Sequence, residues 1–397
     1  MKLNADISKL PEKYICNEEE YYLDPVRKAL FRATPEETIR QNIVAMLLEN
    51  NVPGDMIDIS APLSQYGIQC RYKADVLIGG YCEEEECGVP AVIIKCKSPD
   101  KAVSASDIKT LLKYADELGT DYAAVTNGDV CRYFHYSPEK KQFELINEFP
   151  SYEELISNGL TLHDPVKVPD RIPFNKLNSD GTQAYIGQDI GEDTPEEMQT
   201  ALINLWECLL DENYILPAGE YGIFKVIKDL GVRICSYGNA SGGLFEGPYR
   251  SFLIEYKGSA QIVSLGLSTY YTYACPDIIE TVIAVAVDNA DESHHSLELV
   301  ADDNLICESN SVKFYHSGKI SIGNIGSGKS DELRSFVDQQ CPELIDGKRF
   351  YLGELKNDRL WHLSDDDVSK VVENLISYAL VRDEYRWYVK GKRKMEI

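Results

Sequence analysis

The sequence predicts two α+β domains: an N-terminal domain with a mixed sheet flanked by helices, and a C-terminal domain rich in antiparallel strands. Three observations predict this class. The 397 residues are long for a single hydrophobic core. An apolar run, an amphipathic segment and a second apolar run follow one another between residues 90 and 126, which predicts a right-handed crossover between parallel strands. Residues 220–325 alternate short strand-like stretches with Gly-rich turns.

The N-terminal domain is expected to begin with a short helical lead-in over residues 20–33. The sequence then predicts a helix with Thr34 as its N-cap. Pro35 suits the first helical position, and the Glu37 side chain can complete a capping box with Thr34. The remaining elements follow from apolar periodicity and turn residues. They are strands at 55–60, 68–78 and 90–97, a helix at 104–118, and strands at 121–126 and 130–136.

Proline, glycine, asparagine and aspartate are frequent in residues 161–193, which predicts a linker between a domain at 1–160 and a domain at 194–397. The second domain is expected to open with a helix capped by Thr194 and to close with helices at about 330–340 and 365–385. It resembles no family that we recognise.

No apolar run approaches the roughly 20 residues of a membrane helix, and the N-terminus lacks the apolar core of a signal peptide. Eleven cysteines are scattered without a Cys-x-x-Cys pair or a zinc-like spacing. We therefore expect reduced thiols, a cytoplasmic protein and no membrane partner.

The net charge of −25 constrains any contact with nucleic acid. Phosphate contacts from basic side chains supply most nonspecific affinity for DNA. Residues 1–160 contain 17 basic and 27 acidic side chains, so this domain is acidic as well. A DNA contact would have to be confined to a local groove or be helped by a metal ion or a partner protein.

The chemistry of the chain is concentrated on two expected strands. Asp75 lies in the first, within residues 71–78, and Lys95 and Lys97 end the second at i and i+2, so both lysines share one face. A carboxylate beside a lysine on adjacent strands is typical of metal-dependent phosphodiester cleavage, and Glu37 could add a second acid from the preceding helix.

Four stretches in this order and spacing strengthen that interpretation: residues 35–41 (PEETIRQ), 73–75 (KAD), 92–99 (VIIKCKSP) and 125–128 (VTNG). Over residues 20–140 the sequence resembles the N-terminal nuclease domain of type I restriction enzyme R subunits, a branch of the PD-(D/E)xK nuclease superfamily. The resemblance implies a restriction-endonuclease-like fold, DNA as partner and Mg²⁺ or Mn²⁺ as cofactor. It assigns the metal to Asp75, Glu37 and the backbone carbonyl of Cys96, and it assigns orientation of water or phosphate to Lys97.

Two departures from the family pattern bear on activity. The family has glutamate where this chain has Lys95, and it often has glutamine where this chain has Thr110, four residues before Tyr114. A lysine at position 95 removes a metal ligand and adds a positive charge. The chain is therefore a candidate magnesium-dependent deoxyribonuclease with a degenerate motif and weakened cleavage. The alternative is a non-catalytic binding or regulatory module on a nuclease scaffold, with a partner protein or ligand held by the C-terminal domain.

Each of these residues also has a purely structural explanation. Glu37 could serve only the capping box, Asp75 could pair with Lys73 or Lys97, and Lys95 and Lys97 could form a solvated strand face.

Residues 323–330 (GNIGSGKS) match the phosphate-binding loop pattern G-x-x-x-x-G-K-[ST]. The context argues against that function, because the preceding segment resembles an antiparallel hairpin and too little chain follows for several parallel strands. We expect a Gly-rich turn before a helix.

Overall fold

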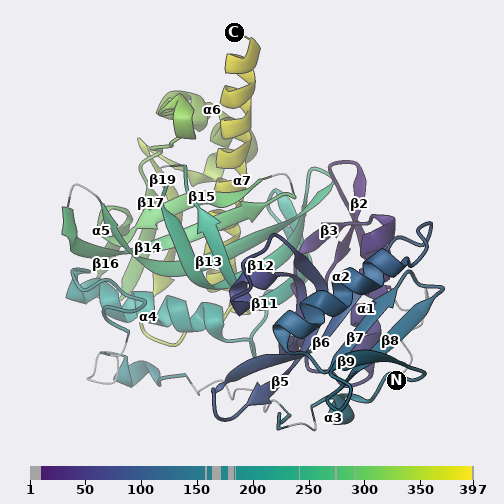
Figure 1. The fold of residues 1–397 in the computed structure, drawn as a ribbon. Coiled ribbons are helices and arrows are strands. Elements are labelled where there is room, and N and C mark those ends of the chain that lie inside the picture. The colour runs from purple at the N-terminus through teal and green to yellow at the C-terminus, as the bar shows by residue number, and fades with distance from the viewer. Residues whose placement is uncertain are drawn as a thin grey trace. The chain divides into compact units, whose positions relative to one another are not determined.

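The computed structural model describes residues 10–156, 159–162, 171–177, 183, 185–240, 242–272, 275–290 and 292–395. The chain divides into two compact units (Figure 1). Unit 1 comprises Met1–Ile15 and Glu19–Val168, and unit 2 comprises Cys16–Glu18 and Pro169–Ile397. Parts of the expected linker, residues 163–170, 178–182 and 184, lie outside the described residues. Within the described residues, no helix is both long and apolar enough to span a membrane.

Unit 1 contains a small sheet in the order β1-β2-β3 and a six-stranded sheet in the order β4-β5-β6-β7-β8-β9. The strands are β1 Lys13–Cys16, β2 Glu19–Leu23, β3 Leu30–Arg32, β4 Ile57–Pro62, β5 Lys73–Cys82, β6 Cys87–Cys96, β7 Tyr122–Thr126, β8 Cys131–Ser137 and β9 Gln142–Ile146. The α-helices are α1 Pro35–Glu49, α2 Ala105–Leu118 and α3 Tyr152–Leu155.

The six-stranded sheet is mixed, as predicted. β6 and β7 are parallel and are joined through α2, whereas every other neighbouring pair is antiparallel. Successive side chains of a strand point to opposite faces. Val76 and Ile94 accordingly share a buried cluster with residues of α1, while Leu77 and Ile93 share another with residues of α2. Helix α2 therefore covers one face of the sheet, and α1 covers the other together with residues of α3.

Both helices begin as the sequence predicts. The Thr34 hydroxyl accepts the Glu37 backbone N–H at 3.1 Å, although the Glu37 carboxylate does not return this cap and lies elsewhere. Ser104 and Asp107 form a complete capping box on α2, which ends at Gly119 in the left-handed region (φ +70°).

The expected helical lead-in at residues 20–33 is wrong. This segment is the β2–β3 hairpin, in which Tyr22 pairs with Phe31. Asp24 explains the difference, because its Oδ1 accepts the backbone N–H groups of Val26 and Arg27 at 2.9 and 2.7 Å and so closes a turn instead of a helix. Strand β9 and helix α3 were not predicted.

Unit 2 carries a six-stranded sheet, β10-β11-β12-β13-β14-β15, and a four-stranded sheet, β16-β17-β19-β18. The strands are β10 Gly219–Tyr221, β11 Phe224–Gly238, β12 Leu244–Tyr256, β13 Ser259–Thr272, β14 Cys275–Asp288, β15 Ser293–Val300, β16 Leu305–Glu308, β17 Ser311–His316, β18 Ile345–Asp346 and β19 Arg349–Lys356. The α-helices are α4 Glu196–Leu210, α5 Ala301–Asn304, α6 Ser330–Gln340 and α7 Asp366–Met395.

The antiparallel character of unit 2 is confirmed, but its central strands are long, up to the 15 residues of β11, where short strands were expected. Gly238 of β11 also pairs with His294 of β15, which joins the last strand of the larger sheet to its second strand. Thr194 does not cap α4, because its hydroxyl instead bonds the buried Thr281 hydroxyl at 2.7 Å.

Helix α7 contacts strands of both sheets of unit 2, β14 and β15 of the larger and β19 of the smaller. Residues over much of its length are consequently buried, including Leu375, Ala379 and Tyr385. This burial places polar residues of α7 in the interior as well as apolar ones.

Candidate functional site

The two acids expected to bind metal are joined by an arginine. Arg40, one turn into α1 from Glu37, directs Nη2 to Asp75 Oδ1 at 2.6 Å and Nη1 to Glu37 Oε2. The other oxygen of Asp75 accepts the backbone N–H of Cys96 at 3.0 Å, across the β5–β6 pair. Both oxygens of Asp75 therefore already accept hydrogen bonds.

A second arginine, Arg27 of the β2–β3 turn, contacts the other side of Glu37. Arg27 Nη2 lies 2.7 Å from Asp24 Oδ2 and 2.8 Å from Glu37 Oε1. Gln41 Nε2 donates to the same Glu37 oxygen at 2.8 Å. We call these six residues the acid–arginine cluster: Asp24, Arg27, Glu37, Arg40, Gln41 and Asp75.

The cluster is largely withdrawn from water and nearly balanced in charge. The Arg40 and Glu37 side chains are 11% and 7% exposed, and Asp24 is fully buried. Burial disfavours the charged guanidinium of Arg40, but Asp75 and Glu37 outweigh it and raise the Arg40 pKa. Three buried or nearly buried carboxylates thus share two guanidinium groups, and the more exposed Glu36 lies 3.4 Å from Arg40 as a fourth.

The two lysines have a partner of their own. Lys97 Nζ forms an ion pair with Asp107 Oδ2 and donates to the Ala102 carbonyl at 3.0 Å. Lys95 Nζ lies 3.6 Å from Asp107 Oδ1 and 5.7 Å from the centre of the Tyr72 ring. The hydrogen bond from Lys97, followed by that from Ser104, lowers the Asp107 pKa.

The structure therefore sorts the four expected side chains into two pairs. Glu37 and Asp75 meet at Arg40, and Lys95 and Lys97 meet at Asp107. The Glu37 carboxylate binds residues of the acid–arginine cluster and does not take part in the helix cap. A capping role alone therefore does not account for this side chain. Neither lysine is a freely solvated side chain, since they are 19% and 16% exposed.

The donor set of this arrangement does not fit a divalent metal ion. Mg²⁺ requires several oxygen ligands in near-octahedral geometry. Here each oxygen of Glu37 and Asp75 faces a hydrogen-bond donor, and Cys96 offers Asp75 its N–H. Among the described residues, no three or more His, Cys, Asp or Glu side chains are grouped so that they could hold a metal.

Sequence reasoning missed Arg40, Arg27 and Asp107. A signal existed for two of them. Arg40 follows Glu37 by three residues on one helix face, a spacing that favours an ion pair. Asp107 occupies the third position of a capping box, whose carboxylate lies near the strand end that carries Lys97. No pattern in the neighbouring sequence predicts that the Arg27 side chain contacts Glu37 of α1.

No curated protein and no solved structure matches the chain significantly. Residues 35–150 match the family model described as "Type I restriction enzyme R protein N terminus (HSDR_N)". The match runs from the start of α1 to just beyond β9 and includes Glu37, Arg40, Asp75, Lys95 and Lys97. Residues 35–150 of unit 1 are therefore similar to the N-terminal region of type I restriction enzyme R proteins.

Proposed function

We propose that the chain is a restriction-endonuclease-like protein that binds DNA and cleaves it weakly or not at all. The family of residues 35–150 supports a nuclease-like or DNA-related role. The observation that carries the weakened cleavage is the Arg40 guanidinium between Glu37 and Asp75.

The chemical argument concerns the charge between the two acids. Metal-dependent hydrolysis needs a cation that lowers the pKa of water and offsets the charge of the phosphate. Arg40 supplies positive charge, but a guanidinium does not lose its proton in proteins and cannot serve as a base. Lys95 adds a second fixed cation where the family pattern has an acid. Both features favour a binding module over an efficient nuclease.

The charge distribution also limits how DNA is bound. With 27 acidic and 17 basic side chains in residues 1–160, few phosphates can be neutralised at once. Because each neutralised phosphate releases counterions, affinity should fall only shallowly with salt compared with a basic DNA-binding domain.

A plasmid assay with Mg²⁺ or Mn²⁺ tests cleavage in the parent, Lys95→Glu, the Lys95→Glu/Arg40→Gln double variant and Asp75→Ala. We expect little cutting by the parent and Asp75→Ala, and more by the double variant, in which an acid returns and the competing guanidinium is gone. Calorimetry with Mn²⁺ should give the same order for metal uptake.

Robust cutting by the parent that disappears in Asp75→Ala would contradict the proposal of weakened cleavage. A gel-shift assay with short duplexes tests the other half. Absence of binding by the parent and by all three variants at low salt would refute DNA as the partner.

A further inference from the structure

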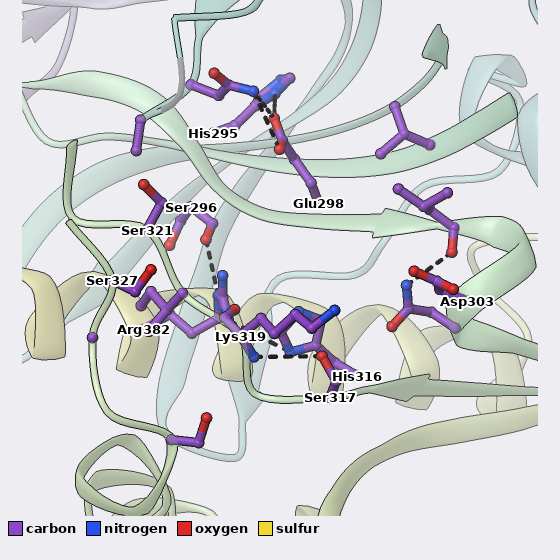
Figure 2. A pocket seen from close by; sticks show the side chains of 18 of the residues that line it. His295, Ser296, Glu298, Asp303, His316, Ser317, Lys319, Ser321, Ser327 and Arg382 are labelled. Carbon is purple, nitrogen blue, oxygen red and sulfur yellow. Dashed lines mark hydrogen bonds and ion pairs between the residues drawn. The ribbon is translucent and has the colours of Figure 1, made fainter. Parts of the chain in front are cut away.

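Unit 2 contains a cavity of about 650 Å³. Its walls come from β15, β17, α7 and the segment between β17 and α6 (Figure 2). This volume lies within the range of small-molecule sites. The polar and charged residues that line it include Asn239, His295, Ser296, Glu298, Asp303, His316, Ser317, Lys319, Ser321, Ser327, Ser330, Arg349, Arg382 and Arg386.

Two arginines one helical turn apart on α7 lie at this cavity with only 4% and 6% of their surface exposed. Arg382 donates to the carbonyls of Ser296 and Lys319 at 3.0 and 3.1 Å. Arg386 donates to the Ser296 hydroxyl at 2.8 Å and the Ser321 carbonyl at 3.1 Å. All these acceptors are neutral, and no described carboxylate lies within ion-pair distance of either guanidinium.

The acids nearest to these arginines have other partners. Glu298 accepts from Asn239 at 3.0 Å and contacts His295 at 3.0 Å, and Asp383 lies 2.9 Å from His294. Burial first, and Arg382 second, lower the Arg386 pKa to about 9, although the charges of Asp383 and Glu298 oppose this shift. Lys319 also lines the cavity without an ion pair among the described residues. Two buried arginines therefore lie side by side at the cavity, with the exposed Lys319 at its wall, and neither guanidinium forms a direct ion pair with a described acid.

Burying like charges without a counter-charge is strongly unfavourable, and a bound anion would relieve it. The donors outnumber what a carboxylate can accept with its two oxygens. Besides the guanidinium groups they include the small hydroxyls of Ser317, Ser321 and Ser327. Three phosphate oxygens match such a set better, and guanidinium groups bind phosphate in a forked geometry.

We propose that this cavity binds the phosphate group of a small phosphorylated molecule about the size of a nucleotide, held by Arg382 and Arg386. The cavity is much larger than a phosphate ion, and its other polar side chains, including Glu298 and Asn239, line the space that would hold the organic part of the ligand. The inference is independent of the acid–arginine cluster and of DNA cleavage.

The site differs from the phosphate-binding loop that residues 323–330 suggest. Ser327, Gly328 and Ser330 line the cavity, but the Lys329 side chain is 81% exposed and lies 3.3 Å from Glu332. The preceding β17 belongs to an antiparallel sheet. Phosphate recognition is thus assigned to α7, and the Gly-rich segment contributes only part of the wall.

Calorimetry of the full chain with inorganic phosphate, adenosine 5′-monophosphate and acetate tests the proposal. We expect the monophosphate to bind more tightly than inorganic phosphate, and acetate to bind least. Arg386→Gln should weaken phosphate binding about tenfold or more, the equivalent of one charge-assisted hydrogen bond. Lys329→Gln, the matched control in the loop motif, should bind as the parent does.

A second pair of variants separates binding from folding. The Ser321 side chain lines the cavity beside the carbonyl that accepts from Arg386. Ser321→Asp places a carboxylate among the cations, so it should raise the thermal midpoint of the ligand-free protein and abolish phosphate binding. Ser321→Asn, of the same size and without charge, should do neither.

Three results would overturn the proposal. One is the absence of binding heat for both phosphate probes at millimolar concentration. Another is loss of binding in Lys329→Gln with Arg386→Gln unaffected. The third is a Ser321→Asp protein that binds phosphate and melts as Ser321→Asn does.

Discussion

Replacing Arg40 by glutamine tests how the acid–arginine cluster is held. The variant keeps a polar side chain of moderate length but removes the charge shared by Glu37 and Asp75. Glu37 retains Arg27 and Gln41, whereas among the described residues the Cys96 N–H is the one donor left to Asp75. The loss of ion-pair energy therefore affects mainly Asp75, whose side chain is 16% exposed.

Breaking a buried ion pair from one side costs about 3–5 kcal/mol. Since Asp75 keeps one hydrogen bond and some exposure, we expect the lower end, about 3 kcal/mol. Removing the guanidinium also frees carboxylate oxygens for a cation. Mn²⁺ at about one hundred times its dissociation constant would then restore about 2.7 kcal/mol.

Hydrogen exchange followed by mass spectrometry measures this locally. All three tryptophans, Trp206, Trp361 and Trp387, belong to unit 2, so tryptophan fluorescence reports on unit 2 and not on unit 1. Arg40→Gln should accelerate exchange of residues 73–82 about a hundredfold and leave the fluorescence transition unchanged.

Arg71→Gln is the control, because Arg71 is an exposed arginine of the same unit. Exchange that is equally slow in both variants would refute the view that Arg40 holds the two acids. Protection by Mn²⁺ that is no greater in Arg40→Gln than in the parent would refute the competition between arginine and metal.

Two further predictions concern other ion pairs. Asp107→Asn should lower the local stability of α2 by about 1 kcal/mol at neutral pH. The Asp107 pKa is lowered in the folded chain, so its contribution is present above about pH 4 and is lost as the pH falls through the folded pKa. Exchange of residues 105–118 measured against pH should show the difference between parent and variant shrinking in acid, and a constant difference would contradict it. Arg250→Met leaves Asp229 buried without the guanidinium that it meets at 2.8 Å through both oxygens, and should cost unit 2 about 3–5 kcal/mol. Urea unfolding followed by tryptophan fluorescence checks this, and a loss below about 1 kcal/mol would argue against it.

Much of unit 1 could be predicted because its signals are local. The caps at Thr34 and Ser104 and the apolar alternation of residues 90–97 each depend on a few neighbouring residues. The parallel pairing of β6 with β7 follows from the helix between them. The β2–β3 hairpin escaped prediction because one side chain, Asp24, determines its turn.

The candidate site was predictable only in part, because its partners come from distant segments. Asp75 and Lys95 could be placed on neighbouring strands from their pattern. Arg40 reaches Asp75 across 35 residues of sequence, and no periodicity indicates which arginine of a helix will turn to a strand. Arg382 and Arg386 were missed for a related reason. Arginines on a helix are normally solvated, and these are buried only because α7 packs between two sheets.

The pairing of Gly238 with His294 has a consequence for how the protein behaves during synthesis and storage. Sheets with long strands, such as β13 and the Val- and Ile-rich β14, expose backbone groups at their borders, where a second molecule can add and start a fibril. Closing β11 onto β15 occupies part of those borders with the chain's own backbone. Loosening this closure, for example by extending the turn after Gly238, should make the protein prone to self-association before it affects either candidate site.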